Sequence, residues 1–221
     1  MLWQTEPPQE EAIISKTVVD LVFDIDCRCL PVEHAYALSQ AIPKALPWFE
    51  SEPLAGLHLI HGAESGNGWC RPEGQDALFF LSRRTKLMLR LPQHRLEDAR
   101  ALKGMTLDIV GNSLKIGVAK EKAFNPMPVL FARYVIAKPE QEEDIFIDEA
   151  VAKLQQIGIQ CRKALCGKTH RLQLPDDEIF TRSLMIADLT PPESITLQQQ
   201  GLGEGRKMGC GLFVPHKKIG V

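Results

Sequence analysis

Residues 201–211 read GLGEGRKMGCG, a glycine-rich stretch that lies between the last predicted helix and the last predicted strand. Five of these residues are glycine, and Arg206 and Lys207 lie among them. Glycine adopts positive φ angles and lets the backbone approach a ligand closely, so such a loop can wrap phosphates. The stretch follows a helix and lacks a Gly-Lys-Ser/Thr ending, so it matches neither a Rossmann fingerprint nor a Walker loop. The alternative is an ordinary connection that needs tight turns.

The second half of the chain, residues 126–221, contains this loop and one order of elements. The expected elements are a strand at 129–136, a helix at 142–157, hairpin strands at 159–165 and 170–174 around Gly167, a strand at 180–189, a helix at 190–200 and a strand at 210–214. Acidic residues in the first turn and Gly158 after the last turn support the helix at 142–157. Thr190-Pro191-Pro192-Glu193 is a capping box that starts the next helix.

The first half, residues 17–125, repeats this order and begins with a strand in which apolar residues alternate with aspartates. The expected elements are a strand at 19–27, a helix from 31 to 42, a short strand at 56–61, hairpin strands at 77–81 and 86–91, a helix at 94–103, and hairpin strands at 106–110 and 113–118. Pro31 opens the first helix, where its missing N–H is not needed. The sequence therefore predicts an α+β fold of two tandem ferredoxin-like (βαββαβ, RRM-like) domains after a flexible tail at 1–16.

Charge is unevenly distributed along the 221 residues. The formal net charge is −2, from 26 Lys and Arg against 28 Asp and Glu. The runs 77–96, 150–175 and 206–221 contain cations and no acid. A polyanion responds to the local field and not to the total charge, so these runs favour a nucleic-acid partner. The alternative is that they are ordinary solvated faces.

Several classes of protein are disfavoured by what the sequence lacks. No apolar run is long enough to cross a membrane, and the acidic start of the chain is unlike a signal peptide. The six cysteines form no C-x-x-C pair, which indicates reduced thiols and no metal site. We therefore expect a cytoplasmic protein without a metal or another cofactor.

The spacing Gly-apolar-Gly, five residues, Gly-x-Gly in the C-terminal loop resembles the RAMP superfamily of CRISPR-associated proteins. GLGEGRKMGCGLFVPHK at 201–217 is similar to the C-terminal signature of the pre-crRNA processing endoribonucleases, Cas family six. GLHLIHGAESGNGW at 56–69 and LSRRTKLMLRLP at 81–92 resemble the Myxan-type branch of that family. The resemblance covers the chain from about Thr17 onward.

This resemblance implies a specific function. Members of the family bind the CRISPR repeat RNA with two ferredoxin-like domains and cut it on the 3′ side of its stem without a metal. The products carry a 2′,3′-cyclic phosphate and a 5′-hydroxyl, and many members stay bound to the mature crRNA in an effector complex. We therefore expect repeat RNA, crRNA and other subunits of a Cascade-like complex as partners, and no membrane.

The cleavage reaction needs a group that takes up and donates a proton near neutral pH, and histidine does both. His34 is the first candidate, because the family's H-x-Y-x-L arrangement falls on residues 34–38 and a helix start disfavours an imidazolium. His61, which ends a short strand beside a glycine-rich loop, is the second candidate. Tyr36 is a candidate helper. The plain alternatives are a histidine at the edge of an apolar stripe, a half-buried strand histidine and a packing tyrosine.

Cations and glycines on three segments are candidates for contacts with the phosphates and 2′-hydroxyls of A-form RNA. They are Arg83, Arg84, Lys86 and Arg90 in the predicted hairpin, Lys168, His170 and Arg171 in the second half, and Gly203, Gly205, Arg206, Lys207, Gly209 and Lys217 near the C-terminus. Lys86 and Arg90 share one face of their strand, which favours this interpretation over simple solubility. We expect these segments to converge into one groove beside the first helix.

Two other functions remain open. A scaffold subunit of the same fold would hold crRNA in an effector complex without cutting it. A tandem ferredoxin-like module for a small molecule or another protein would show no salt-dependent affinity for RNA.

Overall fold

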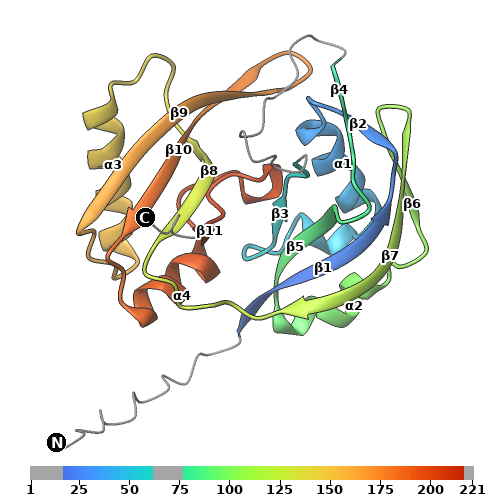
Figure 1. Ribbon diagram of the computed structural model, residues 1–221, viewed down its shortest axis with the longest axis horizontal. Helices are drawn as coiled ribbons and strands as arrows, with labels where there is room; N and C mark the ends of the chain where they lie inside the picture. Colours follow the sequence, from blue (N-terminus) through green and yellow to red (C-terminus); the bar gives the residue numbers. More distant parts are fainter. Residues whose placement is uncertain (1–16, 62–76, 217–221) are drawn as a thin grey trace, which may run out of the picture.

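The strands of the chain form two main sheets, which lie side by side in Figure 1. The structure is a computed structural model that describes residues 17–61 and 77–216. The predicted tail at 1–16 and the predicted RNA contact Lys217 lie outside the described residues.

The first sheet is built by the N-terminal half of the chain. Its strands are β1 (Val18–Asp26), β3 (Gly56–His58), β5 (Lys86–Pro92), β6 (Thr106–Ile109) and β7 (Asn112–Lys122), in the order β3-β5-β1-β7-β6. The helical elements of this half are α1 (Ala35–Ala45), η1 (Pro47–Phe49), η2 (Gln93–Arg95) and α2 (Leu96–Arg100). Leu21 and Phe23 of β1 are fully buried in one core with Leu38 of α1. The alternating pattern along β1 therefore predicts the face of Leu21 and Phe23 correctly, but Asp20 on the opposite face is buried as well.

The second sheet is built by the C-terminal half. Its strands are β8 (Leu130–Ile136), β9 (Lys163–Gln173), β10 (Glu178–Ala187) and β11 (Val214–Pro215), in the order β11-β8-β10-β9. Its helical elements are α3 (Glu143–Gln156), α4 (Pro191–Gln200) and the short η3 (Arg206–Met208) inside the glycine-rich loop. Phe146 and Leu154 of α3 and Leu197 of α4 share its core. The predicted capping box is confirmed, since Thr190 and Glu193 exchange hydrogen bonds at the start of α4.

Both halves have the strand order of a ferredoxin-like unit. Counted in sequence within its βαββαβ unit, the second sheet has the order 4-1-3-2. The first sheet contains the same order, with β6 added at its edge. The predicted α+β class with two tandem ferredoxin-like units is confirmed. The boundary at residue 125 stays a prediction, and it falls between the end of β7 and the start of β8.

The hairpin predicted between 77–81 and 86–91 is wrong in its pairing. The strand β4 (Leu78–Phe80) pairs with β2 (Cys29–Pro31) in a separate two-stranded sheet. β5 pairs with β1 along one edge and with β3 along the other. A strand has only two edges for hydrogen bonds, so β5 has none left for β4. Pro31 ends β2, and α1 begins at Ala35, later than predicted.

The hairpin predicted around Gly167 is also wrong. β9 is one continuous strand, and Gly167 lies inside it against Ser183 of β10. The pairing of β9 with β10 shifts register at this point, which marks a β-bulge. An isolated glycine is typical of a bulge as well as of a turn, because both need backbone room that a Cβ would fill. The glycine alone therefore does not distinguish the two structures.

Candidate active site

A small pocket lies between the two halves, where α1 of the first half meets β8 and β9 of the second. Its lining residues are Val32, Glu33, His34, Ala35, Leu59, Ile60, His61, Phe79, Tyr134 and Leu172. Two of the predicted catalytic residues, His34 and His61, are therefore brought together. Because both halves contribute lining residues, the pocket exists only when the two sheets are packed against each other.

His34 is the N-cap residue of α1, and its side chain is buried. The Ile60 N–H donates to His34 Nε2 at 3.2 Å, and His34 Nδ1 lies 3.0 Å from the Pro31 carbonyl oxygen. A backbone N–H can only donate, so Nε2 accepts and Nδ1 carries the proton that the Pro31 oxygen accepts. The ring is thus a neutral imidazole held by the backbone on both sides.

His61 follows Ile60 directly and is half-buried, which makes it the more exposed of the two histidines. The hydrogen bond from Ile60 to His34 holds the backbone just before His61. The His61 ring contacts the ring of Tyr134, with the centroids 5.9 Å apart and the planes 32° from parallel. His34 therefore fixes the backbone just before His61, and Tyr134 contacts the imidazole ring of His61, the more exposed of the two histidines.

Tyr134 on β8 is a pocket residue that sequence reasoning missed. Its side chain is buried, and its ring meets the ring of His170 on β9 in a T-shaped contact, with centroids 5.4 Å apart. His170, predicted to touch RNA, thus lies against Tyr134. The local sequence signal for Tyr134 is a single phenol in the otherwise mainly apolar strand LFARYVI. A buried tyrosine usually needs a partner for its hydroxyl, so its presence in such a strand indicates a polar neighbour.

Tyr36 is the predicted catalytic residue that the structure leaves outside the pocket lining. It is half-buried on α1, two residues after His34. Each residue of an α-helix turns the side-chain direction by about 100°, so positions two apart point to different sides. The H-x-Y spacing therefore does not place both side chains in one site.

The predicted RNA contact of Arg90 is wrong, because the Arg90 side chain is fully buried and cannot reach RNA. Arg90 Nε and Nη2 donate to the two carboxylate oxygens of Asp20 at 2.8 and 3.1 Å. Arg90 Nη1 donates to the carbonyl oxygens of Gln198 and Phe213 at 2.7 and 2.9 Å. Burial by itself would raise the pKa of Asp20, but Arg90 and His58 hold that pKa well below its ordinary value. Arg90 thus joins the first sheet to the second half.

Arg206 and Lys207 of the glycine-rich loop also bind backbone carbonyls in place of the predicted phosphates. Arg206 Nη2 donates to the carbonyl oxygens of Leu54 and Gln199 at 2.9 and 3.1 Å. Lys207 Nζ donates to the carbonyl oxygen of Glu50. Burial lowers the pKa of Arg206 to about 10, so its guanidinium stays charged at neutral pH. Both cations attach the loop to the first half, and Figure 1 shows η3 lying beside β3.

The glycines of this loop serve close backbone packing. Gly203, Gly205 and Gly209 have φ angles of 74°, 77° and 84°. A Cβ on Gly209 would lie 2.6 Å from the Leu59 side chain, whereas a Cβ on Gly203 would meet nothing closer than 3.8 Å. The backbone N–H groups of 208–211 already donate to carbonyl oxygens within the fold. Of the three glycines, Gly203 alone is exposed and keeps open space for a ligand.

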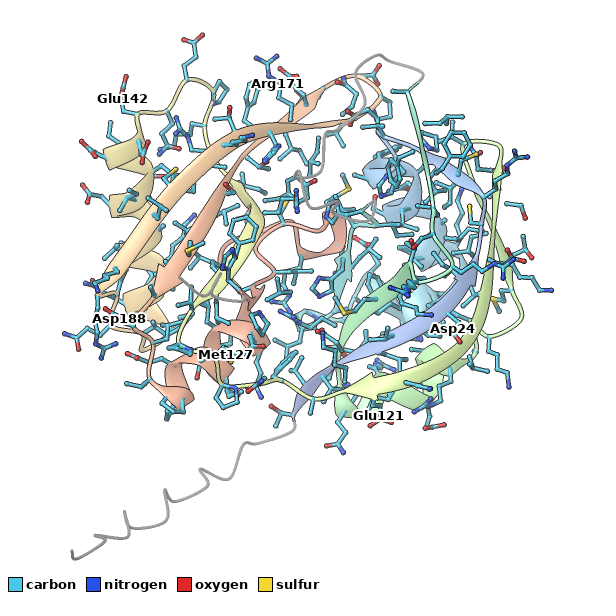
Figure 2. The ribbon with its side chains drawn as sticks, viewed as in Figure 1. Asp24, Glu121, Met127, Glu142, Arg171 and Asp188 are labelled. Atoms are coloured by element: carbon cyan, nitrogen blue, oxygen red, sulfur yellow. The ribbon has the colours of Figure 1, made fainter. Side chains whose placement is uncertain are left out.

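The remaining predicted cations are exposed and come from both halves of the chain. Those with exposed side chains are Arg83, Arg84, Lys86, Lys168 and Arg171. Lys86 Nζ lies 2.6 Å from an Asp24 carboxylate oxygen, and Arg171 Nη1 lies 3.3 Å from a Glu178 carboxylate oxygen. Figure 2 shows Asp24 on the first sheet and Arg171 far from it on the second. Lys86 and Arg171 therefore do not share one groove, and the convergence of the other exposed cations stays a prediction.

Residues 17–61 and 77–216 contain neither a cluster of metal ligands nor a helix fit to span a membrane. No group of three or more histidine, cysteine, aspartate and glutamate side chains in these ranges gathers as metal ligands do. No helix there combines the length and the apolar character that a bilayer crossing requires.

Known proteins share the sequence and the fold of this chain. A family described as Cas6 Crispr matches residues 19–218. The CRISPR-associated endonuclease Cas6 of Myxococcus xanthus (strain DK1622) is 29% identical over 197 residues, which cover 89% of this chain and 81% of that protein.

Solved structures share the fold at low sequence identity. A CRISPR-associated protein Cas6 superposes with a TM-score of 0.62 at 13% identity, covering 90% of this chain and 100% of the other. A RAMP protein described as binding different RNA substrates superposes with a TM-score of 0.56 at 11% identity, covering 89% and 98%. The family match therefore comes from the sequence, and the structures add a common architecture.

Proposed function

The chain belongs to the Cas6 family of CRISPR-associated proteins, and from this membership we propose that it is an endoribonuclease that cleaves CRISPR repeat RNA. The relative from Myxococcus xanthus is named an endonuclease, and the RAMP protein of similar fold is described as binding RNA. The observation that carries the proposal is the pocket at the junction of both halves, which holds His34 and His61 together.

The proposed reaction is an internal transesterification of the RNA. The 2′-hydroxyl oxygen attacks the adjacent phosphorus, the bond from phosphorus to the 5′-oxygen breaks, and a 2′,3′-cyclic phosphate and a 5′-hydroxyl result. One proton leaves the 2′-hydroxyl and one proton reaches the 5′-oxygen, so a single imidazole can take up the first and a protonated group can donate the second. The nucleophile belongs to the RNA, so the step does not need a metal-bound hydroxide.

We assign the proton transfer to His61 and the support of its backbone to His34. His61 is half-buried and adjoins the pocket, so an RNA phosphodiester can approach its ring. Both nitrogens of His34 face backbone groups of Ile60 and Pro31. A proton on Nε2 would break the bond from Ile60, so His34 acts best as a neutral acceptor that orients the segment before His61.

The test uses labelled repeat RNA in EDTA and product analysis for the cyclic phosphate. We expect His61→Ala to slow single-turnover cleavage by about 10²–10⁴-fold, the usual contribution of general acid–base catalysis, and to leave RNA affinity nearly unchanged. His94→Ala is the matched control, since His94 is an exposed histidine that pairs with Glu52 and does not line the pocket. Cleavage by His61→Ala at the wild-type rate would refute the assignment.

We further propose that Arg83, Arg84 and Lys168 contact RNA phosphates, because their side chains are exposed. Each lost contact with duplex phosphate reduces the slope of log K against log salt concentration by about 0.9. Alanine at each position should therefore weaken binding and flatten this slope. An unchanged slope in all three variants would remove these residues from the interface.

A scaffold function is the second candidate, and the tight backbone bonding of His34 favours it over a catalyst that uses His34 directly. In either case we propose that the protein keeps the processed crRNA and joins other subunits of an effector complex. Salt-dependent binding of repeat RNA without any cleavage product would identify the scaffold. Release of labelled crRNA as fast as release of an unrelated hairpin would contradict retention.

A further inference from the structure

The second sheet contains two β-bulges at the same level of the sheet, one on β8 and one on β9, on either side of Ser183 in β10. β10 pairs with β8 on one side and with β9 on the other, and both pairings shift register at Ser183. Leu184 of β10 stands opposite Ala132 and Cys166, and Arg182 stands opposite Val135 and Thr169. Two residues of β8 and two residues of β9 therefore face the single residue Ser183, the pattern of a bulge on each side of β10.

The sheet is packed so closely at this level that only glycine fits on β9. A Cβ on Gly167 would lie 2.4 Å from Ser183 Oγ, far inside a normal contact. Ser183 is itself buried, so its hydroxyl would have to shift within the sheet to make room for a Cβ at position 167. The bulge on the edge strand β9 therefore leaves Gly167 exposed but sets it directly against the buried Ser183 of the central strand β10.

The bulge on β8 changes the side of the sheet to which the side chains point. Along an unbroken strand every second residue points to the same face. Ala132 packs in the core with α3 and α4, so Tyr134 would follow it there without the bulge. Instead Val135 enters that core, and Tyr134 packs on the other face with Ala35 and Cys210.

The bulge on β9 likewise changes the face of the sheet to which the following side chains of β9 point. Cys166 and Leu172 are an even number of positions apart, which in a regular strand places them on one face. Cys166 packs in the core with α3 and α4, whereas Leu172 packs with Tyr134 on the opposite face. The two bulges thus turn Tyr134 and Leu172 together toward the first half.

We propose that this double bulge builds the second-half wall of the active site, and that Tyr134 is a positioning residue that holds the catalytic imidazole of His61. The inference rests on the proposed function and adds a residue to it. The Tyr134 ring contacts the rings of both His61 and His170, at 5.9 and 5.4 Å between centroids. Its carbonyl oxygen accepts a 2.7 Å hydrogen bond from Gly211 N–H, which fixes its backbone to the glycine-rich loop. Because Tyr134 is buried, it acts through His61 and not on RNA.

The test compares variants that keep or remove the ring at position 134. Tyr134→Phe keeps the ring contacts, so we expect a cleavage rate within about threefold of wild type. Tyr134→Leu removes them, and we expect a single-turnover rate at least about tenfold lower with RNA affinity unchanged, because a misplaced catalytic group lowers the rate and not the binding. We also expect its pH–rate profile to move to lower pH, since an aromatic ring favours a protonated imidazole beside it.

Controls separate positioning from packing. Tyr134→Met fills a similar volume without a ring and replaces Tyr134→Leu if the leucine variant fails to fold. Ile179→Ala removes packing from the same cluster but is not a pocket residue, so it should lose stability and keep the wild-type cleavage rate and pH profile. Equal loss of activity in Tyr134→Phe and Tyr134→Leu would overturn the inference, because the ring is present in one and absent in the other.

The outcome also separates this inference from the proposed function. If wild type cleaves and His61→Ala does not, the function stands. Ring-free variants at position 134 that then cleave at the wild-type rate would overturn the positioning role alone.

Discussion

The roles of single cations in this protein depend on what covers them. Lys86 and Arg90 share one face of β5, as their spacing predicts. Lys86 is exposed and pairs with Asp24, whereas Arg90 is fully buried between Asp20 and the end of α4. The strand period determines the face, but the second half of the chain covers only one end of that face. The sequence pattern alone assigns both residues to an exposed face that contacts RNA.

Val110 is a residue under backbone strain. It has a φ of 52° in the turn between β6 and β7 and is 63% exposed. A β-branched residue is disfavoured in this left-handed region, whereas asparagine tolerates it. We expect Val110→Asn to raise the free energy of unfolding by about 1 kcal/mol in urea denaturation. Val118→Asn on β7 is the control, because Val118 is also exposed but is not among the residues with positive φ, and a gain of the same size there would contradict the explanation.

His58 makes the stability of the fold depend on pH, and the direction of this dependence follows from the burial of its side chain. Burial lowers the pKa of His58 below 6.5, although Asp20 beside it acts in the opposite direction. The unfolded chain therefore binds this proton more readily, so the contribution of His58 to stability is present above pH 6.5 and is lost as the pH falls. We expect the urea midpoint to fall between about pH 7.5 and 5.5, and to fall less in His58→Gln. An identical fall in both proteins would exclude His58 as the cause.

The elements of the chain were predicted better than their partners. Most strands and helices in both halves follow from local signals, and the capping box of α4 places that helix correctly. The short strand β2 was not predicted, and β9 was predicted as two strands. The partners of β4 and β9 were wrong, because strand pairing joins residues that are distant in sequence. The resemblance to Cas family six is confirmed by the family match over residues 19–218.

The close contact between Gly167 and Ser183 at the bulge in β9 predicts how substitutions at these two positions change the stability of the second sheet. Gly167→Ala places a Cβ 2.4 Å from Ser183 Oγ, and we expect it to cost about 1–3 kcal/mol of stability, the usual range for overpacking. In Gly167→Ala with Ser183→Ala the nearest remaining Ser183 atom, Cβ, lies 3.7 Å away, so most of this loss should return. A double-mutant cycle in urea measures the coupling. Additive losses would show that Ser183 does not limit position 167.

The two halves are joined by buried polar groups as well as by apolar contacts. Arg90 reaches from β5 to the carbonyls of Gln198 and Phe213, and Arg206 reaches back to the carbonyl of Leu54. A Cβ on Gly56 would lie 2.8 Å from the Leu212 side chain, so the backbone of β3 and the C-terminal segment are in close contact. The halves are therefore held in one relative orientation, which the composite pocket requires.

Replacement of Arg90 tests this junction. We expect Arg90→Met to cost about 3–5 kcal/mol, because it leaves the Asp20 carboxylate buried without its main partner. Arg100→Met is the control: Arg100 pairs with Glu97 and Glu121 at a partly exposed site, and its loss should cost less than about 1 kcal/mol. Equal unfolding midpoints for the two variants would show that Arg90 does not stabilise the junction. Faster proteolysis at 123–129 in Arg90→Met would report the halves separating.

Some residues of the candidate site were predicted from the sequence, and others are recognised only in the tertiary structure. His34 and His61 were found from the sequence, since residue type and a short motif point to acid–base chemistry. Tyr134 was not found, because the sequence contains no sign of the bulge that turns it toward His61. Tyr36, Arg206 and Lys207 were assigned from neighbouring residues in the chain, and the folded chain gives them other surroundings.

The sequence by itself determined the family, most of the helices and strands, the cap of α4 and the buried face of β1 at Leu21 and Phe23, because these depend on residues within a few positions of each other. Only the tertiary structure decided which strand edges meet, which cations are buried and which residues complete the pocket. Burial and pairing depend on the face that another part of the chain presents, and that face is set by register and packing over long sequence distances. The pocket between α1 and β8 belongs to this second class, since neither half holds it alone.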